Sequence, residues 1–323
     1  MVLNRLPGET SVTVAGKDDA EIAEIVADLR TSASRDGFVR VSNSGIDSPA
    51  AFDRVARLLG ASTRPFSEES SPRTALTDLV WSSTDYPSRY PIQFHNEFSY
   101  ASEWPQLVAF CCLVPPSAGG ATPIVDVRRM LERLRPSTRD EFTCRGLLYE
   151  RNFSPGSGVS WQRAFGTGDP QLVEEHCRRA GIDLEWREGG LTTRQTAAAI
   201  VNHPLSGEPV WFNHALLFNV AGVEPSWLRD FFSRQDPSAR AFNSYFEDGE
   251  EIPLERLDEI RFAYAAERDS APWSAGDLLV IDNMLTAHGR DAFSGPRQIV
   301  VSLIGRWTRE DLRGSGRKAG SDL

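Results

Sequence analysis

The sequence has few of the residues that would mark it as a secreted, membrane-spanning or zinc-finger protein. It has four cysteines, no C-x-x-C pair, and two of the four, Cys111 and Cys112, are adjacent within an apolar run. Adjacent residues on a strand face opposite sides, so we expect buried, unpaired thiols in a reducing compartment. No apolar run approaches the length of a membrane span. The N-terminus lacks the apolar stretch of a secretory signal, which favours a cytoplasmic protein.

Basic residues are also in the minority. The 45 Asp and Glu residues outnumber the 35 Lys and Arg residues, which gives a net charge of −10 and a pI of about 5.1. A nucleic-acid-binding protein would need a basic stripe, so we expect no nucleic-acid partner. The remaining composition, with 25% charged and 40% hydrophobic residues, is typical of a globular protein. Nothing in it indicates an oligomeric state.

Hydrophobic periodicity predicts many strands and few long helices. The apolar run 107–114, which ends at two prolines, predicts a central buried strand. Asp169 and Gly181 are typical caps for a helix over 169–180. The other predicted helices are 18–30, 50–59, 127–134 and 254–268, and the other predicted strands are 37–41, 123–125, 192–201, 209–213, 277–282 and 299–304. This pattern favours a mainly β fold, a jelly roll (double-stranded β-helix) with helices packed outside.

Two polar segments define the expected domain organisation. Residues 61–90 are rich in Ser, Thr, Pro and Asp, which predicts a long loop or lid beside a site. From residue 309 the chain is rich in Gly, Arg and Ser, which is typical of a flexible tail. We therefore expect one domain over 1–308, with a lid at 61–90, followed by a tail over 309–323.

Three residues suggest a metal site. His95 and Glu97 are two positions apart, and on a strand such side chains point to the same side. A third ligand, His288, can then arrive from another strand. Two neutral imidazoles and one carboxylate can hold a divalent metal on one face and leave the opposite face open. Non-haem Fe(II) oxygenases use this arrangement.

The motifs around these residues resemble the TauD/TfdA family of Fe(II)- and 2-oxoglutarate-dependent dioxygenases, and within it the SyrP-like branch. The resemblance covers roughly residues 90–305. The segments that carry it are His95–Glu97, Gly119–Pro123, Trp161–Thr167, His203–Asn213, Gly276–Asn283 and His288–Arg297. It implies a clavaminate synthase-like jelly roll, with Fe(II), 2-oxoglutarate as cosubstrate, and O2.

The resemblance also implies residue roles that make physical sense. His95, Glu97 and His288 would be the iron ligands and the catalytic centre. The distal carboxylate of 2-oxoglutarate would need a buried cation, because an unpaired buried carboxylate is costly. Arg297 is the residue for this role, since a guanidinium pairs bidentately with a carboxylate. Thr122 would donate its hydroxyl to the same carboxylate.

Two features of the sequence concern the substrate. Taurine-type members carry a second arginine four residues after the cosubstrate arginine, where this chain has Val301. Relatives that halogenate replace the carboxylate ligand with a small residue, so the presence of Glu97 favours oxygen insertion. Candidates for holding an anionic substrate group are Arg163, Arg290 and Arg89. The candidate substrate contacts are Asn213, Arg163, Phe94 and His214.

These observations predict a dioxygenase that hydroxylates an unactivated C–H bond of an amino acid, free or carrier-tethered, or of a related natural-product intermediate. Decarboxylation of 2-oxoglutarate to succinate and CO2 would accompany the hydroxylation. The same site could instead perform desaturation, epoxidation or cyclisation. A rival of another class is a zinc-dependent hydrolase on a jelly roll, since zinc also takes two histidines and a carboxylate. A non-enzymatic rival is a jelly-roll binding module that holds no metal.

Overall fold

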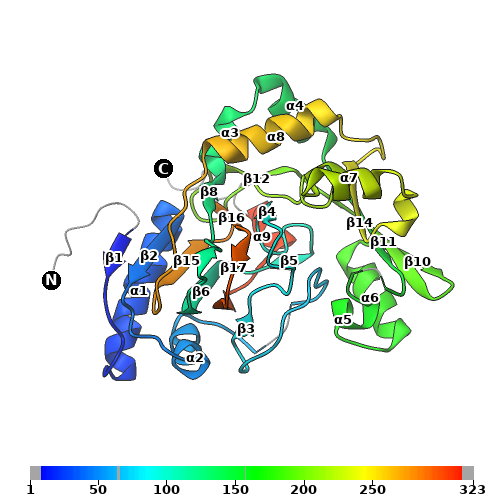
Figure 1. Ribbon diagram of the computed structural model, residues 1–323. Coiled ribbons are helices and arrows are strands. Elements are labelled where there is room, and N and C mark those ends of the chain that lie inside the picture. The colour runs from blue at the N-terminus through cyan, green and yellow to red at the C-terminus, as the bar shows by residue number, and fades with distance from the viewer. Residues whose placement is uncertain (1–8, 64–65, 157, 315–323) are drawn as a thin grey trace, which may run out of the picture.

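Two β-sheets that share one hydrophobic core form the centre of the molecule (Figure 1). The computed structural model describes residues 9–63, 66–156 and 158–314. The larger sheet has the strand order β1-β2-β15-β6-β18-β3, and the smaller has the order β4-β16-β8. Their bounds are β1 (Glu9–Ser11), β2 (Phe38–Ser42), β3 (Trp81–Ser82), β4 (Ile92–His95), β6 (Leu107–Val114), β8 (Ile124–Asp126), β15 (Leu278–Asp282), β16 (Thr286–Arg290) and β18 (Gln298–Ile304).

The central strand β6 shows why its sequence is apolar throughout. Phe110 and Cys112 belong to the inner core, which they share with Ile124 of β8, whereas Ala109 and Cys111 belong to an outer cluster. Successive side chains of a strand point to opposite faces, and here both faces are covered. The adjacent cysteines therefore face opposite ways, as expected, and both are buried free thiols.

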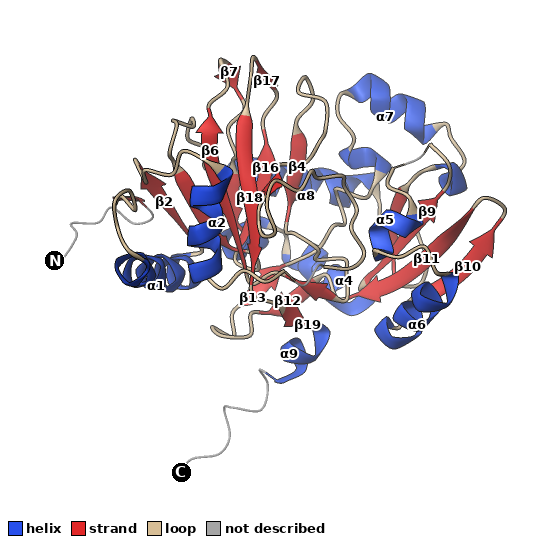
Figure 2. Cartoon of the chain, turned by 90° about the horizontal axis from the view of Figure 1, so that it is seen from below, coloured by secondary structure: helices blue, strands red, loops and turns tan. Residues whose placement is uncertain are grey.

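Two helices cover the outer face of the larger sheet. They are α1 (Asp19–Asp36) and α2 (Pro49–Leu58), and they lie side by side against this sheet (Figure 2). Ile22, Val26 and Phe52 are buried in the outer cluster. A capping box between Asp18 and Glu21 begins α1, because it satisfies backbone N–H groups that have no partner within the helix.

The remaining elements cover the other end of the inner core. A four-stranded sheet has the order β10-β11-β9-β14, and helix α6 packs against β10. The strands are β5 (Glu103–Trp104), β7 (Ala118–Gly119), β9 (Leu147–Phe153), β10 (Asp183–Arg187), β11 (Gly190–Ala197), β12 (Ile200–Asn202), β13 (Pro209–Trp211), β14 (Phe242–Phe246), β17 (Phe293–Ser294) and β19 (Trp307–Thr308). The helices are α3 (Val127–Arg133), α4 (Pro136–Arg145), α5 (Trp161–Phe165), α6 (Pro170–Ala180), α7 (Ser226–Ser233), α8 (Leu254–Ala266) and α9 (Arg309–Gly314), with 3-10 turns at Val220–Gly222 and Pro237–Ala239.

The sheets and outer helices match the predicted architecture, with local differences. Strand β6 has the predicted bounds, and α6 has the predicted caps. Strand Thr192–Val201 of the prediction is divided into β11 and β12. Helices α4 and α7 and strand β14 have no predicted counterpart. Within the described parts of the chain, no helix is long and apolar enough to cross a membrane.

The first residues of the expected flexible tail are helical in the structure. Residues 309–314 form helix α9, in which Arg309 donates to the carbonyl oxygen of Thr196. Asp311 accepts from the backbone N–H of Thr308, and Leu312 packs against the inner core. These contacts fix the first turn of a segment whose composition is typical of a frayed end. Residues 315–323 lie outside the described residues.

Candidate active site

The smaller sheet places the two predicted histidine ligands opposite each other. His95 is the last residue of β4, and His288 of β16 is its partner in the antiparallel register. Directly opposed residues share one face of a sheet, so the two imidazoles point into the same space. Their ring centroids are 4.4 Å apart.

Glu97 reaches the histidines by a route that differs from the predicted one. It lies in a turn after β4 and not on the strand, so strand alternation does not explain its direction. Phe98 takes a left-handed backbone conformation with φ of 57°, which turns the chain back at this point. The Asn283 side chain accepts from the N–H of Glu97 at 2.8 Å and donates to its carbonyl oxygen at 2.9 Å. This buried amide fixes the turn.

Three potential metal-binding atoms converge. One ligand atom each of His95, Glu97 and His288 lies within 4.8 Å of the others. The Nε2 atoms of His95 and His288 are 3.8 Å and 3.4 Å from Oε1 of Glu97. Nδ1 of His95 donates to the carbonyl oxygen of Gln93 at 2.8 Å, which leaves the Nε2 lone pair available. This donor set fits a divalent first-row metal.

The electrostatics of the cluster also favour metal binding. Burial, together with the His95 imidazole beside it, lowers the pKa of His288 to about 4, so this ring is neutral at pH 7. Burial alone would raise the pKa of Glu97, but the Arg73 guanidinium and the imidazoles hold it well below its usual range. Neutral imidazole and ionised carboxylate are the forms that coordinate metals.

A small cavity of about 40 Å³ connects this cluster to the two predicted cosubstrate contacts. Arg297 and Thr122 line it together with the three candidate ligands. Arg297 donates to the carbonyl oxygen of Gly120 at 3.0 Å and to the Ser83 hydroxyl at 3.2 Å. Burial, reinforced by the Arg290 cation, lowers the pKa of Arg297 to about 10. The guanidinium is therefore still charged at neutral pH and poorly hydrated, and an anion would stabilise it.

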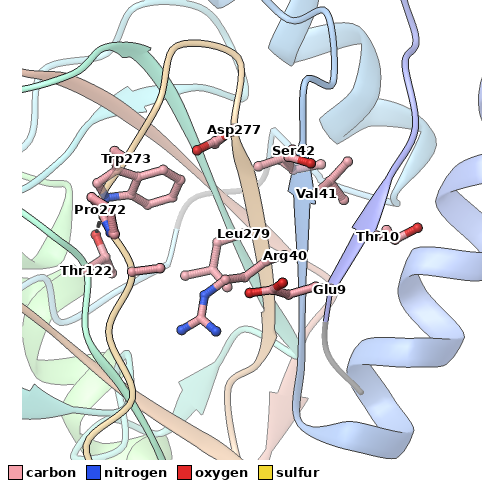
Figure 3. A pocket seen from close by; sticks show the side chains of 12 residues that line it. Glu9, Thr10, Arg40, Val41, Ser42, Thr122, Pro272, Trp273, Asp277 and Leu279 are labelled. Carbon is pink, nitrogen blue, oxygen red and sulfur yellow. Dashed lines mark hydrogen bonds between the residues drawn. The ribbon is translucent and has the colours of Figure 1, made fainter. Parts of the chain in front are cut away.

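The hydroxyl of Thr122 is oriented from behind by a tryptophan. Trp273 donates its indole N–H to Oγ1 of Thr122 at 3.1 Å, as Figure 3 shows. An oxygen that accepts from the indole keeps its own proton for donation. Trp273 and Thr122 also line a separate cavity of about 160 Å³ beside Arg40. Thr122 also lines the cavity at the metal cluster and therefore lies between the two cavities.

A larger cavity of about 370 Å³ meets the small one at the metal cluster. His95, Glu97, Ile92 and Thr84 line both. The walls of the larger cavity are mainly apolar, and they also include the carboxylates Asp85 and Glu224. Its lining residues include Ser70, Ser71, Tyr86, Phe98, Val159, His214, Leu217, Phe218 and Phe242. The cluster therefore lies where two chambers join.

Of the four predicted substrate contacts, the structure brings only His214 to the larger cavity. Burial and the nearby His95 lower the pKa of His214 well below its usual value, and Ser99 lies 2.6 Å from its Nδ1. Asn213 instead bonds the backbone of Ala199 and Ala215.

Phe94 and Arg163 also lie elsewhere. Phe94 stacks on Tyr264 with ring centroids 5.4 Å apart, and neither cavity has Phe94 in its described lining. Arg163 pairs with Glu69 and donates to the carbonyl oxygen of Arg73. Residue type suggested both residues, but Phe94 packs against the core, and Arg163 contacts the backbone and a carboxylate of the loop.

Arg73 is a site residue that the sequence did not reveal. Its Nη2 lies 2.5 Å from Oε1 of Glu97, and its side chain lines the small cavity. It lies in the long loop 61–90, where no periodicity indicates which side chains point inward. The other two arginine candidates have different positions: Arg290 donates to the carbonyl oxygens of Tyr86, Pro87 and Tyr90, and Arg89 lies exposed over the Tyr90 ring.

A jelly roll with two histidines and one carboxylate at the junction of two chambers is the architecture of a non-haem metal oxygenase. The family model described as "Taurine catabolism dioxygenase TauD, TfdA family" matches residues 6–303. The chain belongs to this family. It is an Fe(II)- and 2-oxoglutarate-dependent dioxygenase, and its cofactors are Fe(II), 2-oxoglutarate and O2, as the sequence predicted.

Three known proteins illustrate the similarity. The dapdiamide synthesis protein DdaC of Enterobacter agglomerans is 31% identical over 297 residues, which is 91% of this chain and 90% of DdaC. A clavaminate synthase-like protein of Arabidopsis thaliana is 30% identical over 279 residues, or 83% of this chain and 81% of that protein. A solved asparagine oxygenase shares the fold with a TM-score of 0.51 at 16% identity, over 88% of this chain and 79% of the oxygenase. The predicted jelly roll is confirmed.

Proposed function

We propose that this protein hydroxylates an unactivated C–H bond of an amino acid or of a related natural-product intermediate, with coupled decarboxylation of 2-oxoglutarate to succinate and CO2. The observation that carries the proposal is the meeting of two chambers at His95, Glu97 and His288. One chamber has the size and charge for the tail of a dicarboxylate, and the other can hold a small organic substrate. DdaC takes part in dapdiamide synthesis, and the solved asparagine oxygenase contains Fe(II), 3-hydroxyasparagine and succinate, which supports this substrate class.

The three converging side chains would hold Fe(II) through Nε2 of His95, Nε2 of His288 and a carboxylate oxygen of Glu97. When bound there, the ion would supply the activation of O2, and this activation is coupled to the decarboxylation of 2-oxoglutarate. The protein chain orients the side chains that would bind the ion. The Gln93 carbonyl oxygen fixes the tautomer of His95, and Asn283 fixes the turn that carries Glu97.

Arg297 and Thr122 would hold the distal carboxylate of the cosubstrate. Both line the small cavity, and the Arg297 guanidinium is charged and partly buried. A carboxylate there would accept from the guanidinium and from the Thr122 hydroxyl, whose acceptor side Trp273 occupies.

The larger cavity would take the substrate, and the loop 61–90 would act as its lid. Ser70, Ser71, Asp85 and Tyr86 of this loop line the cavity. The apolar walls exclude water, while Asp85 and Glu224 offer partners for an ammonium group. His214 is neutral by its lowered pKa and offers a hydrogen-bonding nitrogen rather than a charge.

We also propose that the substrate is a small molecule, free or carrier-tethered, and that the reaction takes place in the cytoplasm. Cys111, Cys112 and Cys177 are buried free thiols, which fits a reducing compartment. Binding experiments with carrier-bound substrates check the tethering, and cell fractionation checks the compartment.

A substrate panel tests the function. Purified protein with Fe(II), 2-oxoglutarate and O2 is incubated with individual amino acids and their carrier-bound forms. Succinate release that depends on the substrate, with a product heavier by one oxygen atom, is the expected result. Succinate release with a product lighter by two hydrogens would show that the enzyme desaturates its substrate instead of hydroxylating it. A hydrolysed product without succinate would refute the proposal in favour of the zinc hydrolase.

A further inference from the structure

Arg73 forms a buried ion pair with the carboxylate that is expected to bind iron. Its Nη2 lies 2.5 Å from Oε1 of Glu97, and each side chain is only 9% exposed. The Nε atom of Arg73 is buried and has no hydrogen-bond partner among the described residues. A buried guanidinium with one N–H unsatisfied is costly, which suggests that this side chain has a second binding partner.

A metal held between the three ligands would compete with Arg73 for one oxygen of Glu97. Oε1 of Glu97 is the atom that faces Nε2 of His95 and Nε2 of His288, and it also accepts from Arg73. A divalent cation bound between these three side chains would draw on the charge of Glu97 and repel the guanidinium. A bound metal would therefore weaken the Arg73–Glu97 pair.

Arg73 cannot easily leave the cavity when it loses this partner. The carbonyl oxygen of Arg73 accepts from Nη2 of Arg163 at 2.7 Å, and Arg163 is itself paired with Glu69. The preceding residues Ser70, Ser71 and Pro72 line the larger cavity. The backbone is thus held at the junction of the two chambers, and only the side chain is free to exchange partners.

The other cations of the small cavity have their own partners. Arg290 donates to three backbone carbonyl oxygens of the loop, and Arg297 is placed for the distal end of the cosubstrate. Fe(II) offsets Glu97 and one carboxylate of 2-oxoglutarate, and Arg297 offsets the other. Arg290 is held by backbone oxygens, whereas the anionic partner of Arg73, Glu97, is also the residue that the metal would bind.

We propose that Arg73 binds a free carboxylate of the substrate, which replaces Glu97 as its partner once the metal is bound. This inference rests on the proposed function and narrows its substrate class. The molecule oxidised carries a free carboxylate close to the reacting carbon, as a free amino acid does. A substrate tethered through its only carboxyl group lacks this group.

The test measures binding without turnover. Under anaerobic conditions, the visible charge-transfer band of the Fe(II)–2-oxoglutarate chelate is recorded as substrates are added. Each amino acid of the panel is compared with its own carboxamide. In the wild-type protein the carboxylate form should perturb the band at much lower concentration. In Arg73→Met this preference should fall by roughly 30-fold or more, the size expected when one partner of a buried charge pair is removed.

Three controls separate the possible outcomes. Arg89→Met removes an exposed arginine of the same loop and should leave the preference unchanged. Arg73→Lys keeps the positive charge but cannot pair bidentately with a carboxylate, and it should retain part of the preference for the carboxylate substrate. The metal-free Arg73→Met protein should bind Fe(II) more tightly than the wild type, because a competitor for Glu97 has been removed.

Two results would overturn the inference. The first is that Arg73→Met keeps the wild-type preference for the carboxylate form of the substrate. The second is that Arg73→Met needs more 2-oxoglutarate to form the chelate band, because the anion bound by Arg73 would then belong to the cosubstrate. A wild-type protein whose band responds to no panel member would instead refute the proposed substrate class, and with it this role of Arg73.

Discussion

His288 lies directly across the β4–β16 pair from His95, and this register creates the metal site. The register shifts between His288 and Arg290, so the His288–His95 pair lies directly beside an irregularity in the pairing of β16 with β4. Because side chains alternate, a slip of one residue would turn one imidazole to the opposite face. Strand β4 ends at His95, and the turn that follows brings in Glu97. The three ligands therefore depend on one strand pair and one turn.

Removing one of these imidazoles should abolish metal binding while the fold remains. We expect His288→Ala to lose Fe(II) binding and substrate-dependent succinate release. Fe(II) at 100 times its Kd should stabilise the wild type by about 2.7 kcal/mol through mass action, and it should not stabilise the variant. Thermal unfolding with and without Fe(II) measures this difference.

The matched control is His176→Gln, which changes a histidine of α6 that contacts Glu68 and lies outside the metal cluster. This variant should keep the stabilisation by Fe(II). Turnover at the wild-type rate in His288→Ala would contradict the ligand assignment.

The turn that carries Glu97 should depend on Asn283. Its side chain bonds both the N–H and the carbonyl oxygen of Glu97, and its own carbonyl oxygen accepts from the side chain of Asn96. Asn283→Ala leaves buried backbone groups without partners, at about 1–3 kcal/mol each. Metal affinity should also fall by about 10- to 100-fold, as is typical when a group that orients a ligand is removed. Urea unfolding and an anaerobic Fe(II) titration measure the two effects. A loss of stability without any loss of metal affinity would limit Asn283 to a structural role.

Much of the framework could be predicted from sequence because single segments carry their own signals. Strand β6 is apolar over its whole length and is buried on both faces, so its bounds were clear. Helix α6 has a capping aspartate, a proline in its first turn and a glycine at its end. The iron and cosubstrate residues were found because each lies in a motif that resembles a known family.

The rest depends on tertiary packing, which has no local signature. Helix α4 buries only Thr138 and Phe142, so its amphipathic pattern is weak and the sequence does not predict it. Asn213 has the residue type of a substrate contact, yet its amide bonds the neighbouring backbone. Arg73 belongs to an irregular loop, and only the folded chain shows that it points at Glu97.

Cosubstrate affinity should depend on Arg297 and, to a smaller degree, on Thr122. Arg297→Met should weaken 2-oxoglutarate binding by about 2–5 kcal/mol, because a buried charge pair loses one partner. Thr122→Val removes one neutral donor and should cost about 0.5–1.5 kcal/mol. Trp273→Phe should have an effect only when Thr122 is present, since the indole acts through that hydroxyl.

Titration of 2-oxoglutarate into the anaerobic Fe(II) protein, followed by the chelate absorption, gives these affinities. The control is Arg89→Met, which leaves the small cavity intact. Additive effects of Thr122→Val and Trp273→Phe in the double variant would show that the two residues act independently, against this expectation.

The acid stability of the protein should depend on Glu68, which anchors the start of the loop 61–90. Its carbonyl oxygen accepts from Tyr100 at 2.6 Å and from Arg151 at 2.9 Å, and its carboxylate accepts from Ser102. Burial alone would raise the pKa of Glu68, but the contacts with His176 and Ser102 outweigh it and hold the pKa below the ordinary 4.5. As the pH falls below this value, the unfolded state takes up the proton before the folded state does. Stability from Glu68 is therefore present above pH 4.5 and is lost as the pH falls through its folded pKa.

Replacing this carboxylate should remove that pH dependence. At neutral pH, Glu68→Gln should be less stable than the wild type by about 1–3 kcal/mol, the cost of a weakened buried network. The difference should shrink as the pH is lowered to about 3, because the wild type then loses the same interaction. Urea unfolding across this range measures it. Glu69→Gln changes the neighbouring, more exposed pair with Arg163 and should cost at most about 1 kcal/mol. A gap between wild type and Glu68→Gln that stays constant with pH would show that the carboxyl group has the same pKa in the folded and the unfolded protein. The loop would then be anchored by the backbone contacts of Glu68 alone.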